Sequence, residues 1–189
     1  VPIEGLYVDR NGDGTVTPDD MYRYKKAAPD ATFGFYTGVN LGNFDLSLGA
    51  RAMVGNYVYN NNLASQGVYD FVYNSSGGSG GGYLNNVDSQ TEALDINTPR
   101  YFSDHYVQDG SFLRIDHITA GYDFGNIGSA ISSFRLSITA QNPLLITGYD
   151  GIDPEIAARD ITTNSVGFGI DNNIYPRSRT FLLGLNVKF

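Results

Sequence analysis

The sequence predicts an all-β fold, and more specifically an antiparallel transmembrane β-barrel. Three observations predict it. Five segments alternate apolar and polar residues, the connections between these segments are alternately short and long, and the 189 residues include 14 Tyr and 11 Phe but no Trp. In a bilayer every backbone N–H and C=O must be paired within the protein, so a β-structure can cross only as a closed barrel. The smallest such barrels have about eight strands, and we therefore expect the chain to be a fragment.

The first two segments, at about 32–40 and 43–54, predict a hairpin. In each of them apolar residues share one face and polar residues or glycines share the other, because side chains alternate between the faces of a strand. Only Leu41 and Gly42 lie between the two segments, which indicates a tight turn. The apolar faces carry Phe33, Phe35, Thr37 and Val39 in the first segment and Phe44, Leu46, Leu48, Ala50 and Ala52 in the second.

Three further strands are expected at about 111–124, 133–146 and 180–189. In the first of them the apolar positions change face near Asp116 and His117, which predicts a β-bulge there. The last of them alternates down to an aromatic carboxy-terminus, as the closing strand of an outer-membrane barrel does. An edge strand of a soluble β-sandwich alternates equally well, so the alternation by itself leaves that alternative open.

The lengths of the connections favour the barrel. Residues 41–42 and 125–132 form short connections, whereas 55–110 and 147–179 are long. Outer-membrane barrels have short turns on the periplasmic side and long loops outside. If the chain ends on the periplasmic side, both long connections and residues 1–31 fall outside the cell. A soluble Greek-key sandwich has no reason to sort its connections in this way.

Composition excludes several classes of protein. No run of about 18 apolar residues occurs, so no transmembrane helix is predicted. The absence of cysteine removes disulfides, zinc–thiolate sites and thiol catalysis. A net charge of −8 argues against nucleic acid as a partner, because phosphate binding needs a basic surface. The sequence opens at Val1 on polar residues without a signal peptide, so we expect any export signal to lie outside it.

The segment Asp9–Asp20 has the spacing of an EF-hand-type calcium loop. Such a loop needs oxygen ligands at its positions 1, 3, 5, 7 and 12, with glycine at position 6 for the turn. The ligands would be Asp9, Asn11, Asp13, the carbonyl oxygen of Thr15, and Asp20. We expect a calcium ion there to have a structural role, in making an external loop rigid. The alternative is an Asx-rich turn that holds no ion.

A short helix is expected directly after this loop, over about 18–27. Thr17 can cap the helix, Pro18 can start it and Pro29 ends it. We therefore expect residues 1–31 to form an extracellular loop with the calcium motif and a short helix. Residues 32–189 would then hold the barrel strands and the two long loops.

Aromatic residues in the long connections are candidates for binding a ligand. Tyrosine rings can stack on sugar rings or on peptides, but they can equally pack the loops against one another. The candidates are Tyr57, Tyr59, Tyr69, Tyr73, Tyr101 and Tyr149.

No catalytic site is expected, and the chain is predicted not to be an enzyme. His105 and His117 are the only histidines, and neither has a partner at the spacing of a metal-ligand pair or a nucleophile placed beside it. The glycine-rich run at 77–82 lacks the following Lys-Ser/Thr of a phosphate-binding loop, so it indicates a flexible loop.

Six stretches of the sequence, in this order, resemble the carboxy-terminal region of the SusC-like TonB-dependent transporters of the bacterial outer membrane. The family pattern usually carries Asn and Leu where Asp116, His117 and Ala120 stand here. The six stretches are Val8–Asp20, Asn43–Ser47, Asp109–Tyr122, Ala140–Pro143, Gly148–Glu155 and Tyr175–Phe189.

This resemblance implies a 22-stranded barrel with a plugged lumen, of which the chain would supply the last five strands. Such transporters import nutrients, commonly oligosaccharides and sometimes peptides. A SusD-like surface lipoprotein closes over them as a lid, and TonB supplies the energy. The expected partners are therefore the amino-terminal part of the same barrel, a SusD-like lipoprotein, TonB and the nutrient, and the expected location is the bacterial outer membrane.

Two other kinds of protein remain open at this point. A dockerin-like interaction module would use the same Asp9–Asp20 loop, but such modules normally carry two copies and the sequence has one. A secreted, calcium-stabilised β-sandwich that binds carbohydrate would need neither detergent nor a partner chain.

Overall fold

A computed structural model describes residues 7–68, 73–74, 83–84, 99–159, 166–172 and 174–189. The chain divides into two compact units. One unit is formed by 29–56, 110–154 and 175–189, and we call it the sheet unit. The other is formed by 1–28, 57–109 and 155–174, and we call it the loop unit. The loop unit therefore contains most of each long connection, together with the start of the chain.

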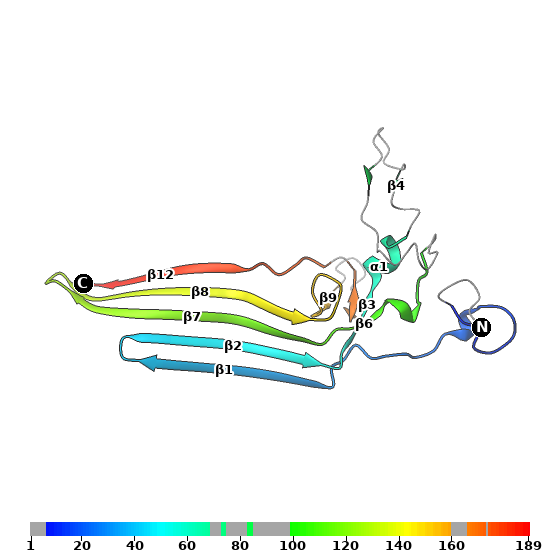
Figure 1. Cartoon of the computed structure of the whole chain (residues 1–189), viewed down its shortest axis with the longest axis horizontal. Coiled ribbons are helices and arrows are strands. Elements are labelled where there is room, and N and C mark those ends of the chain that lie inside the picture. The colour runs from blue at the N-terminus through cyan, green and yellow to red at the C-terminus, as the bar shows by residue number, and fades with distance from the viewer. Residues whose placement is uncertain (1–6, 69–72, 75–82, 85–98, 160–165, 173) are drawn as a thin grey trace. The chain divides into compact units, whose positions relative to one another are not determined.

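The sheet unit is built around five long antiparallel strands, which lie side by side in Figure 1 in the order β1-β2-β7-β8-β12. They confirm the five predicted strands. Their bounds are β1 Ala31–Leu41, β2 Phe44–Val54, β7 Phe112–Ile127, β8 Ile131–Thr147 and β12 Thr180–Lys188.

The turns are close to those expected, but shorter in one case. The β1–β2 turn is Gly42-Asn43, one residue later than predicted, and Gly42 has a φ of 61°, which glycine adopts without strain. Between β7 and β8 only residues 128–130 lie outside the strands, whereas the sequence suggested 125–132. Pairing continues through Gly125 because register shifts around it absorb the irregular positions.

The predicted bulge is confirmed at Asp116. His117 pairs with Gly49 and Ile115 with Ala50, so the register of β2 and β7 shifts across Asp116. The register of β7 and β8 shifts at the same place, where Asn142 and Pro143 on β8 lie opposite the bulge. Proline cannot donate a hydrogen bond to the sheet, so a bulge is one of the few places within a sheet where it is tolerated.

The two faces of this sheet differ in chemistry. Large apolar side chains on one face are solvent-exposed rather than packed against a second layer: Leu183 on β12, for example, is 74% exposed. Other exposed side chains on this face, from 38% to 72% exposed, are those of Phe33, Phe35, Phe44, Leu46, Tyr122, Ile138, Phe181 and Leu185. The opposite face, which we call the polar face, carries mainly hydroxyl, amide, charged and glycine positions, with Leu182 as an exposed apolar exception. One row across it pairs Tyr36, Gly49, His117, Gln141 and Thr180 in turn.

The loop unit has short elements and most of the buried apolar residues. Its three-stranded sheet has the order β11-β3-β6, from Ile170–Asp171, Tyr57–Asn60 and Val107–Asp109. Among its described residues the unit also has helices η1 Pro18–Asp20, α1 Asn61–Gln66 and η3 Asp104–Tyr106. Two strand pairs are described as well: β4 Tyr73–Asn74 with β5 Tyr83–Leu84, and β9 Ala157–Arg159 with β10 Val166–Phe168. Its buried apolar residues are Val58, Ala64, Val68, Tyr106 and Ile156.

The expected helix over 18–27 is wrong in extent. Over 18–27 the structure has a single 3-10 turn, η1, at Pro18–Asp20, and Met21 is already extended. The predicted start is right, because Thr17 and Asp20 form a capping box and Pro18 stands at the first turn. A helix of about ten residues is marginal without a packed apolar face, and here residues 21–26 have no regular secondary structure. Within the described residues, no helix has the length and apolar character needed to cross a membrane.

Candidate functional site

The predicted calcium loop is closed by hydrogen bonds from its own backbone. Asp9 accepts from the N–H groups of Gly12 and Gly14, at 2.7 and 2.9 Å. Asp20 accepts from the N–H groups of Arg10 and Asn11 and, through its other oxygen, of Thr17. The bonds to Asp20 hold the two ends of the loop together at one carboxylate.

Backbone hydrogen bonds favour the charged form of two of the loop carboxylates, Asp13 and Asp20. The backbone N–H of Thr15 lowers the pKa of Asp13, and that of Thr17 lowers the pKa of Asp20. Charged oxygen donors are the ligands that calcium prefers, so the donor set fits this ion chemically. In the described part of the chain no three acidic or histidine side chains converge in a metal-binding group. Calcium binding therefore stays a prediction.

An aromatic cleft of about 720 Å³ lies within the loop unit. Three stretches that are distant in the sequence line it, around 7–24, 59–61 and 101–107, together with Ile170. The hydroxyl of Tyr22 donates to Asp104 at 2.8 Å, and this bond raises the pKa of Tyr22. The aromatic side chains that line the cleft are Tyr7, Tyr22, Tyr24, Tyr59, Tyr101 and Phe102.

The six candidate tyrosines have different surroundings. Tyr59 and Tyr101 line the aromatic cleft, and burial raises the pKa of Tyr59. Tyr57 lies under the ammonium group of a lysine, Lys25, at 4.6 Å. Tyr149, in the sheet unit, is only 5% exposed and packs the protein interior. The backbone of Tyr73 belongs to β4.

Tyr69 lies outside the described residues. Sequence reasoning missed Tyr7, Tyr22, Tyr24 and Phe102 as members of the cleft. The signal for Tyr22 and Tyr24 was their i, i+2 spacing, which places two side chains on one face of an extended segment but not of a helix.

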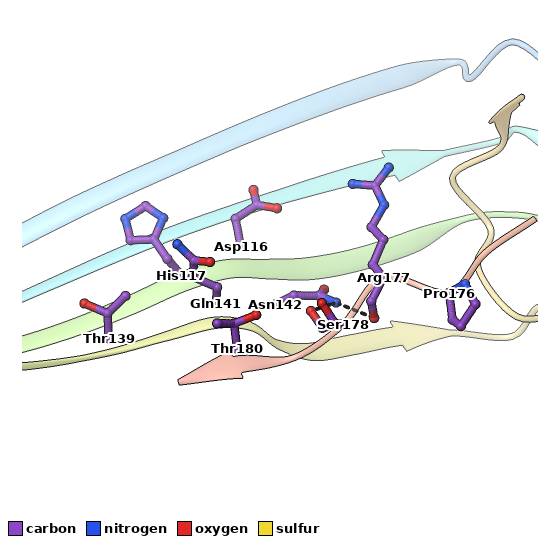
Figure 2. A pocket seen from close by; sticks show the side chains of 9 residues that line it. All are labelled: Asp116, His117, Thr139, Gln141, Asn142, Pro176, Arg177, Ser178 and Thr180. Atoms are coloured by element: carbon purple, nitrogen blue, oxygen red, sulfur yellow. Dashed lines mark hydrogen bonds between the residues drawn. The ribbon is translucent and has the colours of Figure 1, made fainter. Parts of the chain in front are cut away.

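A second, polar hollow of about 700 Å³ lies on the polar face of the sheet. Figure 2 shows His117 and Arg177 toward its two ends, with Asp116 between them. Asp116 at the bulge forms an ion pair with Arg51 at 3.1 Å. The other residues that line the hollow are Thr139, Gln141, Asn142, Pro176, Ser178 and Thr180.

Glycines on the polar face lie beneath side chains of neighbouring strands. A Cβ atom on Gly49 would be 2.5 Å from Cε1 of His117, whose ring extends toward Tyr36 on β1 at a centroid distance of 6.0 Å. The imidazole thus crosses β2 above a residue without a side chain. The glycine is required by this close approach and not by its backbone angles.

The same arrangement recurs at Gly121, over which Arg135 reaches Asp45. The ion pair measures 2.6 Å, and a Cβ on Gly121 would lie 2.5 Å from Nη2 of Arg135 and 2.7 Å from Oδ1 of Asp45. We expect Gly121→Ala to separate this pair and to cost about 1 kcal/mol or less, because the pair is partly exposed. Gly34→Ala is the matched control, since a Cβ added to Gly34 would meet nothing within 4 Å and alanine is better tolerated in a strand.

The Gly121 prediction is checked by thermal unfolding of the detergent-purified receptor at low and high salt. The loss should shrink as salt screens the ion pair in the parent protein. Equal changes for Gly121→Ala and Gly34→Ala would contradict it.

A buried charge cluster ties the ends of the long carboxy-terminal connection to the sheet. Arg114 on β7 donates to Asp153 at 2.6 Å and to the side-chain oxygen of Asn142 at 2.8 Å. Asp153 also pairs with Arg177 at 3.4 Å. Asn142 has a φ of 51° and donates to the carbonyl oxygens of Arg177 and Ser178, as the dashed lines in Figure 2 mark. The cluster therefore joins β7, β8, the residues after β8 and those before β12.

The two histidines make packing contacts. The ring of His105 packs edge-on against Tyr106, and its backbone N–H donates to the hydroxyl of Ser103. His117 contacts Tyr36. These contacts of the two imidazoles give no support to a catalytic role.

Comparison with known proteins assigns the chain to a family. No family model matches it. Over its whole length the chain is 39% identical to the TonB-dependent receptor SusC of Bacteroides thetaiotaomicron. The chain belongs to the SusC-like TonB-dependent receptors. It is also 30% identical, over 97% of its length, to the TonB-dependent receptor P3 of Formosa agariphila.

The chain spans about a fifth of the length of these receptors, 18% of SusC and 19% of P3. Among solved structures it resembles the RagAB peptide importer in its 'closed-closed' state, with a TM-score of 0.67 and 23% identity over 97% of this chain and 20% of that one. The 'open-open' state gives the same TM-score with 20% identity, over 98% of this chain and 20% of that one.

Family membership explains what the five-stranded sheet belongs to. It is part of a TonB-dependent receptor barrel, and the β-sandwich and dockerin alternatives are not favoured. The separation of an exposed apolar face from a polar face is what a barrel wall requires. The apolar face is the one that such a wall turns outward, and the polar hollow and the charge cluster lie on the other face.

Proposed function

We propose that the receptor of which this chain is a part imports a nutrient, an oligosaccharide or a peptide, across the bacterial outer membrane. TonB supplies the energy, and a SusD-like lipoprotein covers the external side. The observation that carries the proposal is the sheet, which exposes an apolar face and keeps its ionic and hydroxyl groups on the other. Its sequence relatives are TonB-dependent receptors, which supports transport rather than catalysis.

In this proposal the two units have different tasks. The five strands form part of the wall, and the loop unit supplies external surface for the nutrient or the lipoprotein. The named states of RagAB, 'closed-closed' and 'open-open', support a mechanism with two states. A nutrient shifts such an equilibrium only if it binds one state better than the other. We infer that nutrient binding favours the closed state.

Deletion of the whole receptor gene tests the proposal. The deletion strain should lose growth on one class of glycan or peptide, and the parent gene should restore it. A strain without TonB should show the same loss. Growth of the deletion strain equal to that of the parent on every glycan and peptide tested would contradict import.

We also propose that the Asp9–Asp20 loop binds one calcium ion that makes the loop rigid. Asp13→Asn keeps an oxygen that can accept the Thr15 N–H bond but removes one charge, so the turn should survive while calcium affinity falls about 10-fold or more. Terbium, which occupies calcium sites, reports binding through luminescence excited by nearby tyrosine, and calcium should displace it. Asp150→Asn, outside the loop, is the control. Terbium binding that is equal in Asp13→Asn and the parent receptor would refute this site.

A further inference from the structure

Phe102 stands out in the loop unit because its backbone is in a disfavoured conformation and its ring is exposed. Its φ is 64°, in the left-handed region that bulky residues rarely adopt, and its side chain is 84% exposed. Its backbone N–H donates to the hydroxyl of Tyr59 at 3.1 Å, which holds the residue in place. A strained residue whose ring is this exposed has no role in packing its own unit, and such strain is concentrated at binding sites.

Three other rings of the aromatic cleft, those of Tyr7, Tyr22 and Tyr24, make contacts within the loop unit that restrict their positions. Tyr22 is fixed by its bond to Asp104 and by the guanidinium of Arg10, which lies 3.7 Å from the ring centroid. Tyr24 packs edge-on to Tyr22 at 5.8 Å. The hydroxyl of Tyr7 donates to the carbonyl oxygen of Tyr101 at 2.6 Å. A ligand that enters the cleft therefore meets preorganised rings, which lowers the entropic cost of binding.

The groups around the cleft suit a sugar ring better than a peptide. A pyranose ring has C–H groups on its faces and hydroxyls at its edge, so it can lie flat on an aromatic ring while its hydroxyls contact water or polar side chains. Arg10 and Asp104, which flank Tyr22, are planar charged groups of that kind. A peptide brings an N–H and a C=O with every residue. The hydroxyls of Tyr7 and Tyr22 already donate within the loop unit, so a peptide carbonyl placed beside them would lose water without gaining a donor.

We propose that this cleft is a binding site for the pyranose rings of a neutral oligosaccharide, with Phe102 as its main stacking platform. The proposal rests on the import function above and adds the position of the site and the class of ligand. It makes Phe102 a specificity-determining residue of the receptor.

Binding of neutral hexasaccharides (gluco-, manno- and xylo-linked) and of hexapeptides to the full receptor, in complex with its lipoprotein, tests the site by calorimetry. Phe102→Asn removes the ring but tolerates the left-handed backbone, and should weaken hexasaccharide binding about 10-fold, the effect of one lost stacking contact. Phe102→Tyr should retain affinity. Tyr175→Asn removes an aromatic ring that is 94% exposed in the sheet unit, outside the cleft, and should leave affinity unchanged.

Melting temperatures of all three variants establish that they fold. Unchanged hexasaccharide affinity in Phe102→Asn, binding of hexapeptides alone, or no binding of any hexasaccharide to the parent receptor would overturn the proposal. These results are separate from the test of import. If the deletion strain loses growth but Phe102→Asn binds normally, import stands and the cleft assignment fails. If the deletion strain grows normally, import itself fails.

Discussion

Asp153→Ala is expected to destabilise the receptor by about 3–5 kcal/mol, the usual effect of removing one partner of a buried ion pair. The side chain of Arg114 is 1% exposed and that of Asp153 is 5% exposed, so neither charge has bulk water as a substitute partner. Without Asp153 the guanidinium stays buried and loses this carboxylate, although Asn142 still accepts from one of its nitrogens. The substitution also removes the contact that holds Arg177, so the segment before β12 should loosen.

The expected loss comes from removing the carboxylate beside a buried guanidinium, and a double variant isolates this effect. Arg114→Met with Asp153→Leu removes both charges and fills similar volume, and should recover most of the stability. Arg51→Ala is the control, because its pair with Asp116 is about one-third exposed and should contribute less than about 1 kcal/mol. Thermal unfolding in detergent measures all three. Equal destabilisation by Asp153→Ala and Arg51→Ala would show that burial of the cluster is not what matters.

The five strands could be predicted from the sequence because strand periodicity is a local property. Two faces of different chemistry require alternation along every strand, and the change of phase near Asp116 follows directly from an inserted residue. The predicted bounds for β1 and β2 agree with the structure to within one residue. The start of η1 could also be predicted from local sequence, because the capping residue Thr17 and Pro18 mark it.

The loop unit could not be predicted because its elements depend on partners far away in the sequence. β3 pairs in parallel with β11, which brings Tyr59 beside Ile170. The same holds for its cleft, where the hydroxyl of Tyr22 meets Asp104. The helix expected over 18–27 was too long because helix length depends on tertiary packing, which cannot be read from the local sequence.

One residue in the sequence indicates the buried charge cluster. Arg114 stands between Leu113 and Ile115 in a strand, and a charged side chain there needs a partner if it is buried. The partner, Asp153, is 39 positions away, beyond the end of β8. Spacing alone therefore could not identify it.

Leu183→Arg is expected to cost about 2–4 kcal/mol and to reduce the amount of receptor assembled in the outer membrane. Leu183 pairs with Ile138 on β8 and lies on the exposed apolar face near the middle of β12. If lipid covers this face, the guanidinium must leave water for hydrocarbon. If water covered it, arginine in place of a leucine that is 74% exposed would be neutral or would improve solubility.

Leu182 provides the matched control, because it is the same residue type one position earlier and points to the opposite face. It pairs with Thr139 and is 46% exposed. Leu182→Arg should be tolerated, since that face carries Arg135 and other polar groups. Heat-modifiable migration on denaturing gels, together with the amount of receptor in outer-membrane fractions, measures assembly. Because the two substitutions change composition, charge and strand propensity identically, a difference between them reflects the surroundings of each face. Equal assembly of the two variants would mean that lipid does not cover the face on which Leu183 lies.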